Sequence, residues 1–289
     1  MSNKIQITAD STIDLTPELY ERFNIKVIPF AVTLGEETYY DGVNITPKDI
    51  FAYFAKTGDL PKTGARSPED FAEFFKKYTD EGYEVVHIGI GSELSSGYAN
   101  AEVAAKENPH VHLVDSRTLS SGSGLLAMYA SELASSGKYS VEEIVKKVSE
   151  RAYHEQSSFI VEKFKFLYKG GRGSMISMLG ANLMRIKPCI RVVDGKNKVG
   201  KKYMGNMDSC VRKYMEDTLQ TFNTPDHTRV MITYPSMTDA MRKAVEEVLA
   251  KYGKFKEILY TQAGSVISSH CGENTVGILY LNDGDEGHY

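Results

Sequence analysis

Short apolar runs that end in small, hydroxyl-rich turns constrain the fold of this chain more than any other feature. The run Val85–Ile90 leads directly into Gly91-Ser92-Glu93-Leu94-Ser95-Ser96-Gly97, and a helical pattern starts near Tyr98. Backbone N–H groups at a helix N-terminus carry partial positive charge, and ligands of open α/β sheets collect beyond the carboxyl ends of strands. The turn 91–97 therefore predicts an anion site.

Two further apolar runs end in similar turns. Ile5–Ala9 is followed by Asp10-Ser11-Thr12, and Val111–Val114 is followed by Asp115-Ser116. Ser, Thr and Asp are good helix N-caps, so capping explains any one of these turns taken alone. Their recurrence adds a second interpretation, in which the three turns converge on one ligand.

Helix starts alternate with the strand-like runs along the first half of the chain. Each start places a capping residue before a proline or an acidic residue, at Thr16, Thr46, Ser67 and Ser140. This alternation, through about residue 155, predicts a mainly parallel sheet flanked by helices. In the second half, Asp194-Gly195 between two apolar runs is a hairpin signal, and the pattern predicts a mixed sheet with helices.

The length of 289 residues is enough for two α/β domains, each with a sizeable apolar core. We place the N-terminal α/β domain at residues 1–155 and the C-terminal α/β domain at residues 156–289. The boundary is approximate, and the two domains can exchange segments.

The composition limits the classes of partner. A net charge of −4 gives no basic excess for a phosphate backbone, so nucleic acid is not expected as a partner. The chain shows no apolar run of transmembrane length and no secretory signal pattern, which favours a cytoplasmic protein. Three widely spaced cysteines predict reduced, mostly buried thiols instead of disulfides or a metal site: Cys189, Cys210 and Cys271.

Standard enzyme motifs are incomplete. A phosphate-binding loop is nearly matched at 195–202, but Lys202 stands where a Ser or Thr hydroxyl is required, and the context is a hairpin. The small residues of Gly122–Ala127 lie too far from the strand end at Asp115 for a dinucleotide fingerprint, so close helix packing explains them better. A Gly-x-Ser-x-Gly elbow is absent. A small-molecule hydrolase or phosphotransferase that uses the hydroxyl-rich turn remains the alternative function.

Metal binding is also not indicated. His110 and His112 can share one face of a strand, but no third ligand clusters with them, and we expect two surface histidines. His270 and Cys271 point to opposite faces if their backbone is extended, so they do not form a nucleophile pair. We expect His270 to act as a donor in a glycine-containing turn, Ser268–Gly272, without a metal or cofactor.

Methionines concentrate in one stretch of the second half, at Met175, Met178, Met184, Met204, Met207 and Met215. Their flexible, polarizable side chains suit a wall that fits a long apolar ligand, although their spacing alone favours packing in an ordinary core. Together with the anion site, this pattern suggests an amphiphile with an acidic head.

Several short motifs occur in the order found in one protein family. They are Ala9-Asp10-Ser11-Thr12-Ile13-Asp14-Leu15, Tyr40-Asp41-Gly42, Leu94-Ser95, Asp115-Ser116, Lys169-Gly170-Gly171-Arg172, Ile186-Lys187-Pro188 and His270. The order resembles that of DegV-family proteins, and the resemblance spans nearly the whole chain.

The resemblance implies a bacterial lipid-binding protein with two α/β domains. In such proteins a Thr, a Ser and a His fix the carboxylate of a long-chain fatty acid near the domain interface, and the acyl chain is buried. Some members are the FakB-type, non-catalytic subunit of a fatty acid kinase. A separate ATP-dependent kinase subunit then phosphorylates the carboxylate, and the acyl phosphate supplies phospholipid metabolism.

Carried over by motif, the resemblance assigns the carboxylate to Thr63, Ser95 and His270. Four further residues are assigned supporting roles: Ser11, Ser96, Gly97 and Arg172. Two hydroxyls and an imidazole N–H can satisfy a carboxylate that is otherwise costly to bury.

The chain departs from the family pattern beside each of the three carboxylate residues. Gly64-Ala65-Arg66 follows Thr63, Ser96-Gly97 follows Ser95, and Cys271-Gly272-Glu273 follows His270. The family reads Ser-x-Pro, Gly-Thr and Thr-Gly-Pro at these places. We expect local differences in backbone geometry, and an acidic Glu273 that weakens anion binding. An arginine of kinase-coupled members is also missing around Lys201-Lys202-Tyr203.

Overall fold

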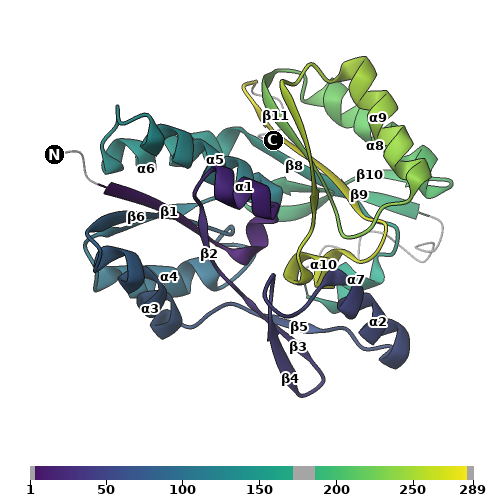
Figure 1. Cartoon of the computed structure of the whole chain (residues 1–289). Helices are drawn as coiled ribbons and strands as arrows, with labels where there is room; N and C mark the ends of the chain where they lie inside the picture. Colours follow the sequence, from purple (N-terminus) through teal and green to yellow (C-terminus); the bar gives the residue numbers. More distant parts are fainter. Residues whose placement is uncertain (1–3, 172–185, 285–289) are drawn as a thin grey trace.

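The structure of the chain is a computed structural model, which describes residues 4–171 and 186–284 (Figure 1). Its strands are β1 (Lys4–Asp10), β2 (Lys26–Ile28), β3 (Ala31–Leu34), β4 (Glu37–Tyr40), β5 (Lys62–Gly64), β6 (Tyr83–Gly89), β7 (Val111–Asp115), β8 (Glu155–Ile160), β9 (Ile186–Val193), β10 (Lys196–Met204), β11 (Pro225–Tyr234), β12 (Glu257–Gln262) and β13 (Val276–Asn282). The α-helices are α1 (Pro17–Arg22), α2 (Pro47–Thr57), α3 (Pro68–Thr79), α4 (Gly97–Lys106), α5 (Ser121–Ser135), α6 (Val141–Arg151), α7 (Lys165–Lys169), α8 (Met207–Thr221), α9 (Asp239–Tyr252) and α10 (Ser265–Cys271).

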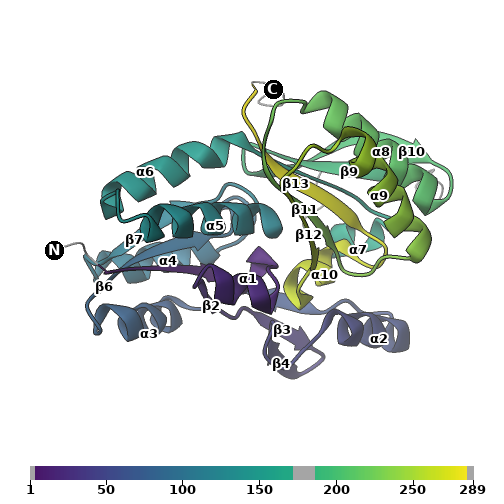
Figure 2. The same cartoon turned by 45° about the horizontal axis from the view of Figure 1, so that its top comes forward.

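The first sheet is parallel, with the strand order β2-β1-β6-β7. Helices α3 and α4 pack on one of its faces, and α5 and α6 pack on the other (Figure 2). Because all four strands run the same way, the turns that follow β1, β6 and β7 meet at one edge of the sheet. The predicted α/β arrangement of the first half is confirmed.

The predicted helix starts are also confirmed. Helices α1, α2, α3 and α6 each begin directly after their predicted capping residue. Ser67 and Asp70 form a reciprocal capping box at α3, and Ser140 and Glu143 form another at α6. These local bonds satisfy the backbone N–H groups that a helix leaves open at its start.

The second sheet is mixed and six-stranded, in the order β10-β9-β8-β13-β11-β12. Only the β11–β12 pair is parallel, and the other neighbours are antiparallel. Asp194 and Gly195 both have positive φ, at 52° and 75°, and connect β9 to β10 as the hairpin signal predicted. This pairing confirms that the near phosphate-binding loop at 195–202 lies in a hairpin.

A third sheet was not predicted. Strands β4, β3 and β5 form a small antiparallel sheet of three- and four-residue strands. Such short strands carry too few side chains for a clear alternation between buried and exposed positions. The sheet matters for function, because β5 carries Thr63.

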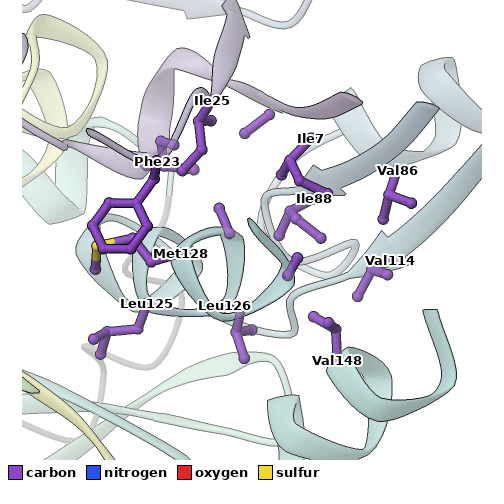
Figure 3. Close-up of a cluster of buried hydrophobic side chains, with 14 of the residues drawn as sticks. Ile7, Phe23, Ile25, Val86, Ile88, Val114, Leu125, Leu126, Met128 and Val148 are labelled. Carbon is purple, nitrogen blue, oxygen red and sulfur yellow. The ribbon is translucent and has the colours of Figure 1, made fainter. Parts of the chain in front are cut away.

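One hydrophobic cluster joins the two larger sheets through α5. Leu125, Leu126 and Met128 of this helix pack with Ile7 and Ile88 of the parallel sheet (Figure 3). Met231 and Leu279 of the mixed sheet belong to the same cluster. The division at residue 155 therefore stays a prediction, since the core is continuous across it.

Glycines let α5 approach its neighbours, as expected from their small size. A Cβ on Gly124 would lie 2.7 Å from Leu15 Cδ2 and 2.8 Å from the Ile13 carbonyl oxygen. A Cβ on Gly122 would lie 2.6 Å from Ser157 Oγ. The predicted close packing of this segment is confirmed.

The cysteine prediction also holds: Cys189, Cys210 and Cys271 are buried and carry free thiols.

Within residues 4–171 and 186–284, no helix combines the length and the apolar character needed to cross a bilayer.

Candidate functional site

A cavity of about 130 Å³ lies where the parallel sheet, the small sheet and α10 meet. Its polar lining includes Thr63, Ser95, Ser96, Asn197 and His270. The structure thus brings the three predicted carboxylate residues to one cavity from β5, the turn before α4 and α10. These segments are widely separated in the sequence, and the fold alone places them together.

Thr63 and His270 contact one another directly. Thr63 Oγ1 lies 2.8 Å from His270 Nε2, and both side chains are half-buried. Thr63 is held in place because β5 pairs with β3, with Thr63 opposite Val32. A threonine hydroxyl that accepts a hydrogen bond from an imidazole can still donate its own O–H to a third group in the cavity.

His270 lies in a helix, so the predicted turn is wrong. It occupies the last turn of α10, and Gly272, with φ of 77°, ends that helix. In a helix successive side chains are about 100° apart instead of opposite, and both His270 and Cys271 line the cavity. The error came from the local sequence, since the serine-rich segment before His270 has weak helix propensity.

The turn 91–97 both forms a local hydrogen bond at the start of α4 and contributes to the cavity lining. Ser95 Oγ accepts a hydrogen bond of 3.1 Å from the Gly97 backbone N–H, at the start of α4. Ser95 and Ser96 also line the cavity. A hydroxyl that accepts a bond still has its own O–H to donate, so capping and ligand binding are compatible.

The three strand-end turns do not all reach the cavity. Thr12 and the turn 91–97 line it, whereas Asp115 and Ser116 do not. Asp115 instead accepts a 2.6 Å bond from Ser92 Oγ, and Ser116 bonds Ser123. The predicted convergence of three turns is therefore wrong for the third turn.

The four residues that were assigned supporting roles also do not all line the cavity. Ser96 lines the cavity. Ser11 is buried and donates a 3.0 Å bond to Asp41, so it supports the framework and not the cavity. Gly97 is buried where a Cβ would lie 2.6 Å from Phe30 Cζ, and its role is packing. Arg172 lies outside the described residues.

The predicted effect of Glu273 is not supported by its position. Its side chain lies 3.8 Å from Lys163 Nζ in an exposed ion pair, and it is not part of the cavity lining.

Asn197 lines the cavity and was not predicted. It belongs to β10, beside the hairpin turn, and its Oδ1 is buried without a hydrogen-bond partner among the residues that the structure describes. Lys196 Nζ lies 3.3 Å from a Glu93 oxygen and ties this hairpin to the turn 91–97. Only the tertiary packing of the hairpin on that turn identifies Asn197, so no local pattern could have found it.

A buried carboxylate supports the floor of the cavity. Asp10 Oδ2 accepts a 2.8 Å bond from the Ile90 N–H, and Oδ1 accepts one of 3.0 Å from the Thr12 N–H. Burial raises the pKa of Asp10 above its ordinary value, although these bonds oppose the rise. Asp10 thereby fixes two lining residues from two different turns.

The cavity also has apolar lining residues. Phe159, Leu167 and Ile267 are among them, and a second cavity of about 20 Å³ adjoins the first. The two cavities share four lining residues: Leu119, Phe159, Ile267 and Cys271. An elongated apolar ligand that passes Phe159 and Ile267 would reach the second cavity.

The predicted methionine wall is not found among the described residues. Met207 and Met215 pack in the core around α8, and Met204 is exposed. Met175, Met178 and Met184 lie outside the described residues. Burial in an ordinary core thus explains the two buried methionines.

His110, directly before β7, and His112, on β7, lie at the opposite end of the parallel sheet. His110 and His112 both contact Glu84, at 2.9 and 2.8 Å. Across the described part of the chain, no group of three or more His, Cys, Asp or Glu side chains is arranged to hold a metal ion.

Comparison with known proteins gives a family match and close structural likenesses. A family model described as an uncharacterised protein of the DegV family matches residues 4–283. A protein of Thermotoga maritima named fatty acid-binding protein is 30% identical over 284 residues, which cover 95% of this chain and 96% of the relative.

Solved structures share the fold along almost their whole length. A DegV family protein from Thermus thermophilus, described by its fatty acid binding, has a TM-score of 0.88 and 29% identity and covers 96% of this chain and 99% of its own. The Streptococcus pneumoniae fatty acid kinase B3 protein, loaded with linoleic acid, has a TM-score of 0.82. It covers 97% of this chain and 100% of its own at 17% identity, which shows a shared fold.

Proposed function

The chain belongs to the DegV family, and from this we propose that it binds a long-chain fatty acid in the cavity beside α10. The carboxylate would lie at Thr63, Ser95 and His270, and the acyl chain would extend past Phe159 and Ile267. One observation carries the proposal: Thr63, Ser95 and His270, from three separate segments, line one cavity whose lining is otherwise largely apolar.

The polar groups match the needs of a carboxylate. If His270 Nε2 donates to Thr63 Oγ1, the Thr63 hydroxyl can donate to one carboxylate oxygen. The Ser95 hydroxyl, which accepts from Gly97 N–H, can donate to the carboxylate as well. Hydrogen bonds from two neutral hydroxyls offset the cost of desolvating the head group without burying a second charge.

The apolar lining residues of the cavity suit an acyl chain. Burying a methylene group contributes about 0.8 kcal/mol, so a long chain gains most of its binding free energy from the walls around Phe159, Leu167 and Ile267. The head group would then fix the orientation of the ligand more than its affinity.

We also propose that this chain presents its bound fatty acid to a separate kinase. Ser96 is exposed and Ser95 half-buried, so a head group beside these two serines would lie near the protein surface. A separate ATP-dependent kinase subunit could phosphorylate it there, and the acyl phosphate would enter phospholipid synthesis in the cytoplasm. This chain would act as the non-catalytic carrier.

Denaturing extraction of the purified protein, followed by mass spectrometry, tests the binding proposal. We expect one long-chain fatty acid per chain, or stoichiometric uptake of added acid by protein from which lipid has been removed. Absence of bound acid together with failure to bind added acids would overturn it. Turnover of a small ester or phosphate substrate that Ser95→Ala abolishes, without bound lipid, would favour an enzyme instead.

A further inference from the structure

Two buried carboxylates from the first half of the chain hold the start of α10. Asp14 Oδ1 accepts a 2.8 Å bond from the Gly264 N–H, and Asp41 Oδ1 accepts a 2.6 Å bond from the Ser265 N–H. Both aspartates are at least nine-tenths buried. Gly264 is the N-cap position of α10 and cannot itself supply a side-chain cap, so the aspartates take over that function.

The second oxygen of each of the two carboxylates accepts a hydrogen bond from a serine hydroxyl. Ser11 donates a 3.0 Å bond to Asp41 Oδ2, and Ser120 bonds Asp14 Oδ2. Ser11 itself accepts a 3.1 Å bond from the Phe30 N–H. Each aspartate is therefore held at both oxygens, and its position is defined by the parallel sheet and the segments around it.

The fit at Gly264 leaves no room for a side chain. A Cβ there would lie 2.9 Å from Asp41 Oδ1 and 3.1 Å from Asp14 Oδ1. The backbone of α10 thus approaches both carboxylates as closely as a glycine allows.

The same helix carries His270 at its other end. From Ser265 to His270 is five residues, or about 7.5 Å along the helix axis. Thr63 contacts His270 Nε2 at 2.8 Å, so residues of the first half hold α10 at its start and at its end. A shift of the first turn would pass through this short helix to the imidazole.

We propose that Asp14 and Asp41 are positioning residues, which set the place of His270 in the cavity by anchoring the first turn of α10. This inference rests on the proposed function only for its effect on ligand affinity. The placement of His270 itself can be measured without a ligand.

The test compares four variants by NMR of the His270 imidazole in lipid-free protein and by fatty-acid affinity. Asp41→Ala removes the acceptor, whereas Asp41→Asn retains an oxygen for the Ser265 N–H. Gly264→Ala leaves both carboxylates but places a Cβ against them. Glu155→Gln is the matched control, because its half-buried carboxyl group lies at the start of β8 and accepts a hydrogen bond from Ser157.

We expect Asp41→Ala and Gly264→Ala to shift the His270 imidazole resonances and to weaken binding by about tenfold, equivalent to 1.4 kcal/mol. Asp41→Asn should stay close to the unmodified protein on both measurements, and Glu155→Gln should not move the resonances. If Asp41→Ala does not fold, the imidazole resonances of Gly264→Ala alone test the proposal. Unchanged imidazole resonances in folded Asp41→Ala or Gly264→Ala would overturn the proposal.

The two proposals fail differently. If the unmodified protein binds no fatty acid, the proposed function is wrong, while the imidazole resonances still report whether the aspartates position His270. If the protein binds fatty acid and the resonances do not respond, only the positioning role is wrong.

Discussion

His270 is the single side chain on which the proposed head-group site depends most, because it contacts Thr63 and lines the cavity. His270→Ala removes the partner of the Thr63 hydroxyl. We expect fatty-acid affinity to fall by about 1 to 3 kcal/mol, the cost of an unsatisfied buried polar group. Isothermal titration measures the change, with His110→Ala at the far end of β7 as the control. Equal affinities in folded His270→Ala and the unmodified protein would exclude His270 from the site.

Asn197 gives a second prediction at the residue scale. Asn197→Asp would place a carboxylate against the proposed head group, so affinity for a fatty acid should fall by about tenfold or more. Binding of the fatty alcohol of equal length should change less, because the alcohol carries no charge. Lys202→Gln changes the net charge equally, lies exposed on the same strand, and should leave both affinities unchanged. Equal losses for acid and alcohol would contradict a head-group role.

The family motifs pointed to three residues that line one cavity, and their role as carboxylate ligands stays a prediction, whereas residues defined by tertiary contact were missed. Thr63, Ser95 and His270 meet at one cavity, as their motifs implied. Asn197 has no such motif, and the role of Ser11 in holding Asp41 depends on a neighbour thirty residues away. Contacts of this kind follow from packing, which a local pattern does not encode.

Strand β6 contains a buried histidine with a clear pH consequence. Burial lowers the pKa of His87 to about 3, and its Nδ1 lies 3.0 Å from Thr8 Oγ1. The unfolded chain binds a proton below about pH 6.5, while the folded protein does not until about pH 3. The free energy of unfolding should therefore fall as the pH falls between these values.

His87→Gln tests this prediction, since it removes the titrating group from the buried strand. The full difference in pKa corresponds to about 4 to 5 kcal/mol of pH-dependent stability. Urea unfolding at a series of pH values should show a flatter acid limb for His87→Gln than for the unmodified protein. Identical pH profiles for the two proteins would show that His87 does not titrate as its burial requires.

Helix α5 gives the second prediction at the element scale. Gly124→Ala would force a methyl group against the Ile13 carbonyl oxygen, which is backbone and cannot move freely. We expect a loss of about 1 to 3 kcal/mol in the free energy of unfolding, the usual cost of overpacking. Ser135→Ala, at the exposed end of the same helix, should change it by less than about 0.5 kcal/mol. An unchanged or stabilised Gly124→Ala protein would contradict the close packing.

The element scale also shows why some segments were predictable. The capping residues before α1, α3 and α6 act within one turn, so the local sequence defines them. Helix α10 differs, because its first turn is capped by Asp14 and Asp41 from the first half of the chain. Local propensity favoured a turn there, and long-range hydrogen bonds favour the helix.

At the scale of the whole molecule, the continuous core around α5 joins the parallel and mixed sheets. We expect one cooperative unfolding transition instead of two, because neither half keeps its full core without the other. A bound fatty acid at about 100 times its Kd should stabilise this transition by about 2.7 kcal/mol. Two separate transitions, observed by calorimetry, would contradict a shared core.

The fold class was predictable because alternating strands and helices follow from short-range periodicity. The small sheet, the shared core and the exact meeting of β5, the turn 91–97 and α10 depend on how the elements pack. The head-group cavity exists only in that packed arrangement, so the sequence could indicate its residues without describing its shape.

The most direct test of the central claim is NMR of a carboxyl-labelled long-chain fatty acid titrated into lipid-free protein. We predict a separate bound carboxyl resonance that saturates at one ligand per chain and moves in Thr63→Ala and Ser95→Ala. A bound resonance that these two substitutions leave unchanged would place the carboxylate elsewhere. The absence of any bound resonance at saturating ligand would contradict fatty-acid binding itself.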